Sequence, residues 1–310
     1  MKEIDCNVCG SRKNTKVFSV RDLYIKKDNP AQFTLVHCGR CGFAYLNPQP
    51  NYEELSPFYQ NGYFDSVKKS GDRKGLYLFL KKIRRKIFPK FHPRFYRWDI
   101  GDRKLPANFL DVGCATGAKA QTFIDDFPKW KFFGVEPDAQ AAKIAATVPG
   151  LTVSHGFLKG THYPDNFFDV VLFHHVLEHT LDPRGDIEEN HRILKPGGRL
   201  IVVVPNYASF AAKFFGKYWR HLDIPRHLFH FRKQDLKNLL DDVGFDIKEM
   251  GSESIQGSLL NSFLISIGIE KTFDNTLPIV LFRFFLIPIN KVAEIFGLGG
   301  ALCLLATKRK

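Results

Sequence analysis

The sequence has no long uninterrupted hydrophobic stretch. No run of about 18 apolar residues occurs, so the chain is not expected to span a membrane. Its first residues, MKEIDCNVCG, contain no apolar signal-peptide core, and we therefore expect a cytoplasmic protein. Internal repeats and low-complexity segments are also absent. These absences favour a globular protein, and the length of 310 residues suits one large α/β domain plus a smaller module.

Acidic residues are scarce in one part of the chain. The protein has 45 Lys or Arg against 32 Asp or Glu, a net charge of +13. Between Lys68 and Lys104, fourteen Lys or Arg accompany only three Asp, which gives this segment a net charge of +11. The rest of the chain is therefore close to neutral. An anionic partner, if there is one, is expected to contact this segment.

The basic segment has the pattern of an amphipathic helix. Apolar residues recur at helical spacing at Leu76, Phe79, Leu80, Ile83 and Ile87, with Lys81, Lys82, Arg85 and Lys86 on the other face. This pattern suits an anionic membrane surface, and equally a lid helix with a solvated basic face. A second apolar stretch, residues 277–289, is interrupted by Arg283 and Pro288 and could enter a membrane interface, cover a substrate pocket or form a dimer contact.

Composition divides the chain into four regions. We expect a cysteine-containing module at 1–60, a basic linker or lid at 61–105, a catalytic domain at 106–250 and an apolar extension at 251–310 that closes with the last strand. Within the third and fourth regions, strands are expected at 108–112, 131–135, 151–154, 170–173, 199–204, from 245 and at 301–307, with helices near 117–127, 138–147, 184–194 and 233–243. Apolar strands that alternate with helices predict an α/β fold, a Rossmann-like parallel sheet with helices on both faces.

A glycine-rich turn follows the first of these strands. The segment FLDVGCATG (109–117) ends a strand at Val112 and begins a helix near Gly117, and its glycines let the backbone approach a ligand closely. The next strand ends at Glu136, which is positioned to accept hydrogen bonds from two ribose hydroxyls. The spacing GxAxG differs from the GxGxxG of dinucleotide-binding proteins, and a glycine-rich turn by itself is often only a tight turn.

Four blocks in this order resemble class I S-adenosylmethionine (SAM)-dependent methyltransferases: DVGCATG, GVEPD, FFDVVLFHHVLEHTLDP (167–183) and HRILKPGGRLIVVVPN (191–206). The resemblance implies a class I fold that binds SAM through Asp111, Gly113, Cys114, Gly117, Glu136, Phe173 and His174. Ala115 stands where a glycine is common. The segment GFLKG (156–160) lacks the acidic residue that many relatives place near the adenine amine, so adenine recognition is expected to rest on Phe157 and backbone groups.

Four of the six cysteines form two CxxCG motifs, with Cys6 and Cys9 in one and Cys38 and Cys41 in the other. Four thiolates at this spacing can close a tetrahedral shell around zinc, and a closed shell predicts a structural site in a zinc-ribbon-like module. The motifs and the following FAYLNPQPNYEELSPFY resemble the zinc-binding module of bacterial sugar and cell-surface biosynthetic methyltransferases. The further C-terminal domain of the longer sugar C-methyltransferases has no counterpart here, which weakens the case for transfer to a nucleotide-sugar carbon.

Histidines concentrate in HHVLEH (174–179) and RHLDIPRHLFHF (220–231). Methyl transfer needs a general base when the acceptor is protonated, and histidine suits this role near neutral pH. We select His175, at the carboxyl edge of the fourth strand, and His227, on a loop after the fifth, although a packed or helix-capping histidine is an equally simple interpretation of each. Quinone O-methyltransferases, which the first stretch also resembles, hold a divalent metal here with acidic residues and a histidine. Because His175 replaces one acid, we expect no such metal.

The sequence therefore favours a SAM-dependent methyltransferase that acts on a small or carrier-linked biosynthetic intermediate, such as a sugar, a glycan or a lipid-linked acceptor. The basic segment adds peripheral contact with the anionic inner face of a membrane as an expectation. Two alternatives stay open: an RNA methyltransferase that grips the phosphate backbone, and a binding protein that retains SAM without turnover. Against RNA, no NPPY-like or Pro-Cys motif occurs, and the cysteine module is not notably basic. The oligomeric state and the acceptor atom are not indicated.

Overall fold

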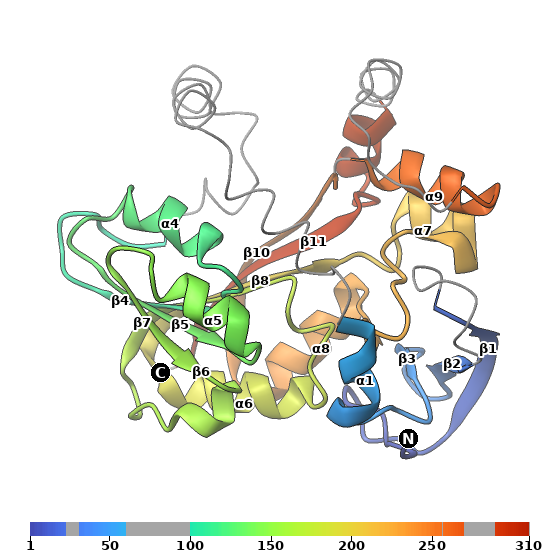
Figure 1. Ribbon diagram of the computed structural model, residues 1–310, viewed down its shortest axis with the longest axis horizontal. Coiled ribbons are helices and arrows are strands. Elements are labelled where there is room, and N and C mark those ends of the chain that lie inside the picture. The colour runs from blue at the N-terminus through green and yellow to red at the C-terminus, as the bar shows by residue number, and fades with distance from the viewer. Residues whose placement is uncertain (23–30, 60–99, 256, 270–288, 310) are drawn as a thin grey trace.

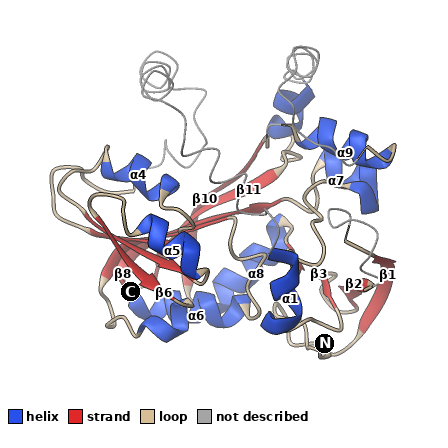
Figure 2. Ribbon diagram, viewed as in Figure 1, coloured by secondary structure: helices blue, strands red, loops and turns tan. Residues whose placement is uncertain are grey.

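The computed structural model describes residues 1–22, 31–59, 100–255, 257–269 and 289–309. The amphipathic pattern at 76–87 and all but the last residue of the apolar stretch 277–289 lie outside these residues. A seven-stranded and a four-stranded sheet organise the described part of the chain, shown by element in Figure 1 and by secondary structure in Figure 2. No helix in it is long and apolar enough to cross a membrane.

The large sheet has the strand order β10-β11-β8-β7-β4-β5-β6. Its members are β4 (Asn108–Val112), β5 (Lys131–Glu136), β6 (Leu151–His155), β7 (Phe168–His174), β8 (Leu194–Pro205), β10 (Phe245–Glu253) and β11 (Ala301–Lys308). Only β11 runs antiparallel to its neighbours, β8 and β10, while the other pairs in the sheet are parallel. The Rossmann-like α/β sheet predicted from the alternating pattern is confirmed. Strand β8 begins five residues before the predicted start because Leu194 pairs with Phe168 of β7.

Helices cover both faces of this sheet (Figure 1). On one face lie α4 (Ala118–Ile124) and α5 (Ala139–Ala145), and on the other α6 (Pro183–Ile193) and α8 (Lys233–Val243). Adjacent residues of each strand enter opposite cores. Phe109 packs in the cluster that contains Phe123 of α4, whereas Leu110 packs in the cluster that contains Ile187 of α6. This period of two is what a strand buried on both faces requires.

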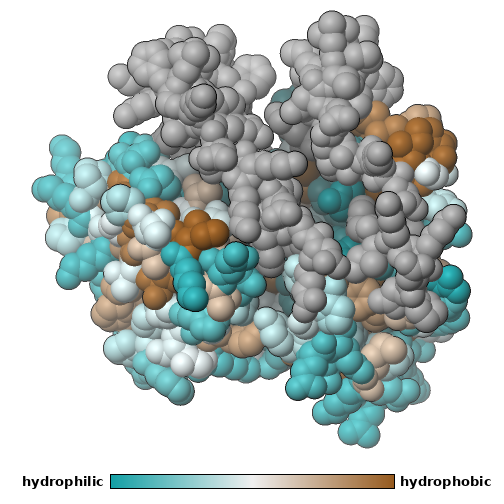
Figure 3. Space-filling model, viewed as in Figure 1, coloured by the Kyte–Doolittle hydropathy of each residue, from teal (hydrophilic) through white to brown (hydrophobic). Residues whose placement is uncertain are grey.

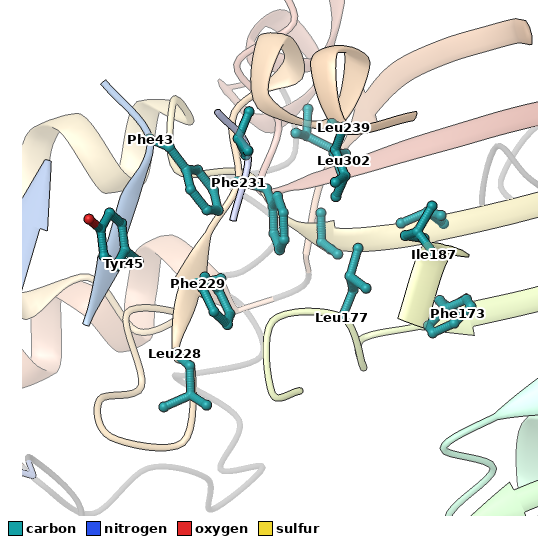
Figure 4. Packing of buried hydrophobic residues seen from close by; sticks show 14 of the residues in the cluster. Phe43, Tyr45, Phe173, Leu177, Ile187, Leu228, Phe229, Phe231, Leu239 and Leu302 are labelled. Carbon is teal, nitrogen blue, oxygen red and sulfur yellow. The ribbon is translucent and has the colours of Figure 1, made fainter. Parts of the chain in front are cut away.

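The small sheet joins the N-terminal module to the catalytic domain. It contains β1 (Asn14–Val20), β2 (Phe33–Cys38), β3 (Ala44–Leu46) and β9 (Phe229–His230), in that order. Strand β9 belongs to the catalytic part of the chain, yet it pairs with β3 of the module. Phe43 of the module packs 5.9 Å from Phe229 and 5.2 Å from Phe231, measured between ring centroids (Figure 4). One continuous core therefore holds the module against the sheet.

Three further short helices bear on the candidate site and its surroundings. Helix α1 (Tyr52–Tyr59) follows β3, whereas α7 (Phe210–Phe215) and α9 (Ser258–Ser266) pack against each other beyond the carboxyl end of β8. Figure 1 shows α7 and α9 at the far end of the molecule from α5 and β6. The chain between β8 and β9 thus connects α7 to the loop that carries His227.

Candidate functional site

The carboxylate of Glu136 is fixed at the end of β5. The side chain is only 5 % exposed. Its Oε2 accepts a hydrogen bond from the Ala115 amide at 2.8 Å, and its Oε1 accepts one from the Asp138 amide at 2.9 Å. Burial raises the pKa of Glu136, while these two amide donors oppose the shift. The acid therefore bridges the glycine turn after β4 and the start of α5, which is the position expected for a residue that holds a ribose.

The glycine turn needs its glycines for two separate reasons. Gly113 has φ +64° and Gly117 has φ +78°, values that side chains rarely tolerate. A Cβ on Gly113 would also lie 2.5 Å from Cγ2 of Val176, and one on Gly117 would lie 2.9 Å from Cγ2 of Val148. Ala115 has φ +47°, a conformation that favours glycine. The turn accepts alanine at a cost of about 1 kcal/mol.

Cys114 and Asp111 lie beneath the turn. A Cβ on Gly134 of β5 would lie 2.7 Å from Sγ of Cys114, so the thiol fills the space that this glycine leaves open. Asp111 is buried, and its Oδ2 has no hydrogen-bond partner among the described residues. Burial raises the pKa of Asp111 to about 7, and the charge of Lys119 on α4 lowers it in part. Cys114 therefore contributes packing, whereas Asp111 offers an unused acceptor beside the turn.

Two aromatic side chains, Phe157 and Tyr52, lie near Glu136. The Phe157 ring is half exposed and meets the Tyr52 ring edge to face, with centroids 5.2 Å apart. Burial raises the pKa of Tyr52, and the charges of Asp138 and Glu136 raise it further. Tyr52 begins α1, so the N-terminal module contributes to this pair.

Phe173 and His174, the last residues of β7, have different surroundings. Phe173 is completely buried and packs in the sheet core with Leu177 and Ile187 (Figure 4). Burial lowers the pKa of His174 well below its usual value, with the charges of Lys119 and His175 adding to the shift. His174 is therefore neutral near pH 7. Phe173 packs in the core at the carboxyl end of β7.

A carboxylate and two imidazoles converge after β7. One ligand atom from each of Glu178, His179 and His227 lies within 4.8 Å of the others. The Oε2 atom of Glu178 is buried and has no hydrogen-bond partner among the described residues. His175 lies beside this group, with φ +57° and its Nδ1 3.2 Å from Oε1 of Glu178. The structure thus pairs the predicted His227 with His179, and the predicted His175 with Glu178. The group could accept a proton or hold a cation.

Backbone carbonyls set the orientation of both imidazoles. The Nδ1 atom of His227 lies 2.8 Å from the His221 carbonyl oxygen, and that of His179 lies 3.0 Å from the Arg226 carbonyl oxygen. A carbonyl can only accept, so each Nδ1 carries the proton and each Nε2 keeps its lone pair. The two rings are 4.5 Å apart between centroids. Burial, followed by the charge of His179, lowers the pKa of His227 well below its usual value, so this ring is neutral near pH 7 and keeps the lone pair on Nε2.

The N-terminal module holds the loop that carries His227. Arg226 is buried and donates hydrogen bonds to both carboxylate oxygens of Asp22, at 2.7 and 2.9 Å, and to the Phe58 carbonyl at 3.2 Å. The same guanidinium donates to Asp223 at 2.9 Å. The Tyr59 hydroxyl lies 3.1 Å from Nδ1 of His179. The module therefore fixes both imidazoles from the outside.

The four cysteines of the CxxCG motifs form one cluster, with their sulfur atoms within 4.8 Å of one another. Sγ of Cys6 lies 3.6 Å from that of Cys41, and Sγ of Cys9 lies 3.4 Å from that of Cys38. Sulfur atoms at the corners of a tetrahedral zinc site are about 3.8 Å apart, so the cluster fits zinc. The glycine after each motif has a positive φ, +69° and +71°, as the turn of such a motif requires.

Residues 79–249, more than half of the chain, match the family model described as "Methyltransferase domain". The chain belongs to this methyltransferase family. Its catalytic part is a class I SAM-dependent methyltransferase domain, as the resemblance predicted, and SAM is the cofactor of that domain.

Two curated relatives agree with this assignment. A "probable S-adenosylmethionine-dependent methyltransferase" of Mycolicibacterium smegmatis is 31% identical over 48% of this chain and 56% of its own length. One of the same description from Mycobacterium tuberculosis is 30% identical over 47% of this chain and 51% of its own. The chain thus spans about half the length of these curated relatives. A SAM-dependent methyltransferase from Methanosarcina mazei is 17% identical, over 71% of this chain and 98% of its own, with a TM-score of 0.47.

Several residues of the candidate site were not predicted from the sequence. Tyr52, Tyr59 and Asp22 come from the module, and no local pattern places them beside Glu136 or the histidines. The segment FAYLNPQPNYEELSPFY was recognised, but only as part of the zinc-module resemblance. Lys119 was also missed, although its position in the first turn of α4 could have signalled it.

Proposed function

We propose that the protein is a SAM-dependent methyltransferase that acts on a small or carrier-linked biosynthetic intermediate, such as a sugar, a glycan or a lipid-linked molecule. One observation carries the proposal: the fixed acid Glu136 and the histidine pair His179–His227 lie at the same carboxyl edge of the sheet. Ligands bind at this edge in open α/β sheets. A methyl donor and a base for its acceptor would therefore meet there.

Each proposed cofactor residue would contact a different part of SAM. Glu136 would accept from the ribose hydroxyls, and the backbone at Gly113 would approach the methionine moiety, with Asp111 as the nearby acceptor for its ammonium group. Phe157 and Tyr52 would border the adenine. These residues align the donor, and alignment is the main contribution that an enzyme makes to an in-line methyl transfer.

His227 is the better placed of the two predicted bases. Its Nε2 keeps a lone pair because Nδ1 donates to the His221 carbonyl. A carboxylate oxygen of Asp223 lies 3.8 Å from Nε2 and would stabilise the ring once it has accepted a proton. Although burial opposes ionisation of Asp223, the charge of Arg226 lowers its pKa, so it stays negative. This arrangement suits removal of a proton from a hydroxyl acceptor.

The N-terminal module favours a compact acceptor over RNA. Its described residues, 1–22 and 31–59, contain six Lys or Arg and five Asp or Glu, nearly balanced charges that offer little to a phosphate backbone. The module instead packs its side chains onto the catalytic loop through Arg226 and His179. We infer that zinc held by the four cysteines is structural, since four thiolates leave no open position.

Replacing His227 by alanine is expected to lower the rate of methyl transfer by about 10²- to 10⁴-fold, because a positioned general base contributes that much. The affinity for SAM should stay unchanged. The substrates are a panel of nucleotide sugars and lipid-linked glycans, and mass spectrometry identifies methylated products. His162→Asn, at an exposed loop histidine with φ +51°, is the matched control and should retain full activity. Methylation of RNA but of no panel member would refute the proposed acceptor class.

A further inference from the structure

Helix α9 buries polar residues and exposes apolar ones, which is the reverse of a normal surface helix. Its buried residues are Leu260 and three polar residues, Ser258, Asn261 and Ser262, and each of the three polar residues is at most 5 % exposed. The outward side carries Phe263 and, just past the helix end, Ile267, both about half exposed. The Ser262 hydroxyl donates to the Ser258 carbonyl and accepts from the Arg220 amide, whereas the Ser258 hydroxyl has no hydrogen-bond partner among the described residues. A helix that faces water would place these two sets of residues the other way round.

Two neighbouring segments extend this apolar surface. Phe214 of α7 is 71 % exposed, and Ile295 and Phe296, in and just after the helical residues 289–295, are 80 % and 73 % exposed. The Phe210 amide of α7 donates to the Leu298 carbonyl, and α7 packs against α9, so the three segments meet. We define the apolar face as Phe214, Phe263, Ile267, Val292, Ile295 and Phe296. Figure 3 shows hydrophobic side chains gathered over α9 at this end of the molecule. Large exposed apolar groupings of this kind mark interaction sites.

The charges around the apolar face are almost all positive. Lys213, Lys217 and Lys291 are exposed on the same segments. Within residues 206–222, 257–269 and 289–298, the only acid is Glu294, which pairs with Lys291 at 2.7 Å. A second copy of the chain packed face to face would bring like charges together, because a two-fold interface places the same patch on both sides. An anionic surface complements these lysines.

We propose that the apolar face docks the protein on an anionic lipid bilayer. The three phenylalanines enter the boundary between headgroups and acyl chains, and Lys213 and Lys217 contact the headgroups, in the manner of an interfacial helix. Docking does not depend on methyl transfer. If the acceptor is lipid-linked, as proposed above, docking would also bring it near the His227 loop. The chain from α7 continues directly into that loop. A bilayer at α7 would present such an acceptor close to the catalytic histidines.

Vesicle sedimentation tests the docking directly. The wild type is expected to sediment with vesicles of phosphatidylcholine and phosphatidylglycerol in equal parts, and weakly with phosphatidylcholine alone. Phe214→Glu combined with Phe296→Glu should weaken binding at least about tenfold, since each change removes an aromatic ring from the lipid contact. Both side chains are largely exposed, so the variant should keep the thermal midpoint and SAM affinity of the wild type.

The matched control carries the same two charges at exposed apolar positions elsewhere, Val17→Glu with Leu105→Glu, and should bind vesicles like the wild type. Two outcomes would overturn the proposal. The first is a wild type that ignores the anionic vesicles, or a Phe214/Phe296 variant that still binds them fully. The second is a wild-type dimer in solution that becomes monomeric in this variant, which would assign the face to self-association. SAM binding, measured without lipid on the same proteins, tests the methyltransferase site separately.

Discussion

Replacing Cys38 and Cys41 together by serine is expected to abolish zinc binding and to unfold the N-terminal module. Structural zinc contributes on the order of 10 kcal/mol to the folding of small zinc modules. The sheet of the module depends on β9 for its fourth member, so loss of the metal removes a large share of what holds the two cysteine motifs in place. Metal analysis should find about one zinc per chain in the wild type and none in the variant.

Unfolding of the module should also disturb the loop that carries His227. Arg184 donates to the carbonyls of Asn7 and Val8 in the first cysteine motif, and Arg232 donates to the carbonyl of Cys41 in the second. Limited proteolysis should therefore cut the variant within residues 1–59 first, and SAM-dependent activity should fall as well. Cys303→Ala, in the central sheet, is the control and should retain zinc. Metal-free wild-type protein with unchanged protease resistance would show that zinc has no structural role.

Gly113→Ala is expected to destabilise the protein by about 2 to 4 kcal/mol and to weaken SAM binding at least tenfold. Alanine at φ +64° costs about 1 to 2 kcal/mol, and the overlap of its Cβ with Val176 at 2.5 Å adds an overpacking cost. Relief of that overlap must displace either Val176 or the turn. Urea unfolding gives the stability, and calorimetry gives the affinity.

Gly197→Ala separates the two causes. Gly197 has a similar φ, +75°, but no atom lies within 4 Å of the Cβ that alanine would add. It lies near the start of β8, whereas the glycine turn follows the end of β4. This variant should show only the backbone cost, about 1 to 2 kcal/mol, with normal SAM affinity. Equal effects of the two alanines on SAM binding would mean that close approach at Gly113 is not part of the cofactor site.

The elements of the central sheet were predictable because their signals are local. The pattern of apolar residues gave β4 and α8 with the bounds observed, and Gly244 ends α8 in the left-handed conformation typical of a helix stop. The place of β11 between β8 and β10 was not predictable in this way. A strand pattern indicates that Ala301–Lys308 is extended, whereas its neighbours depend on contacts with distant residues.

In the candidate site, too, residues with local signals were predictable, whereas contacts between distant residues were not. The glycine turn and Glu136 follow local rules, so the sequence located them, and the positive φ values support the turn geometry. His227 was selected from its loop position, but its pairing with His179 was not predicted, nor was the contact of His179 with Tyr59, which comes from the module. The inverted polarity of α9 was also missed. The residues that face inward there include Ser and Asn, and only the packed structure shows which side is buried.

Calorimetric titration with SAM, for the wild type and Glu136→Gln, tests the central claim most directly. Glutamine keeps the shape of the side chain and can accept from the Ala115 amide, but it cannot offer a charged acceptor to the ribose. The account predicts that the wild type binds SAM and that affinity falls by at least about tenfold in the variant, the loss expected for charge-assisted hydrogen bonds. Glu249→Gln, at an exposed acid on β10, should bind like the wild type. Equal SAM affinity in all three proteins would contradict the assignment of the cofactor site.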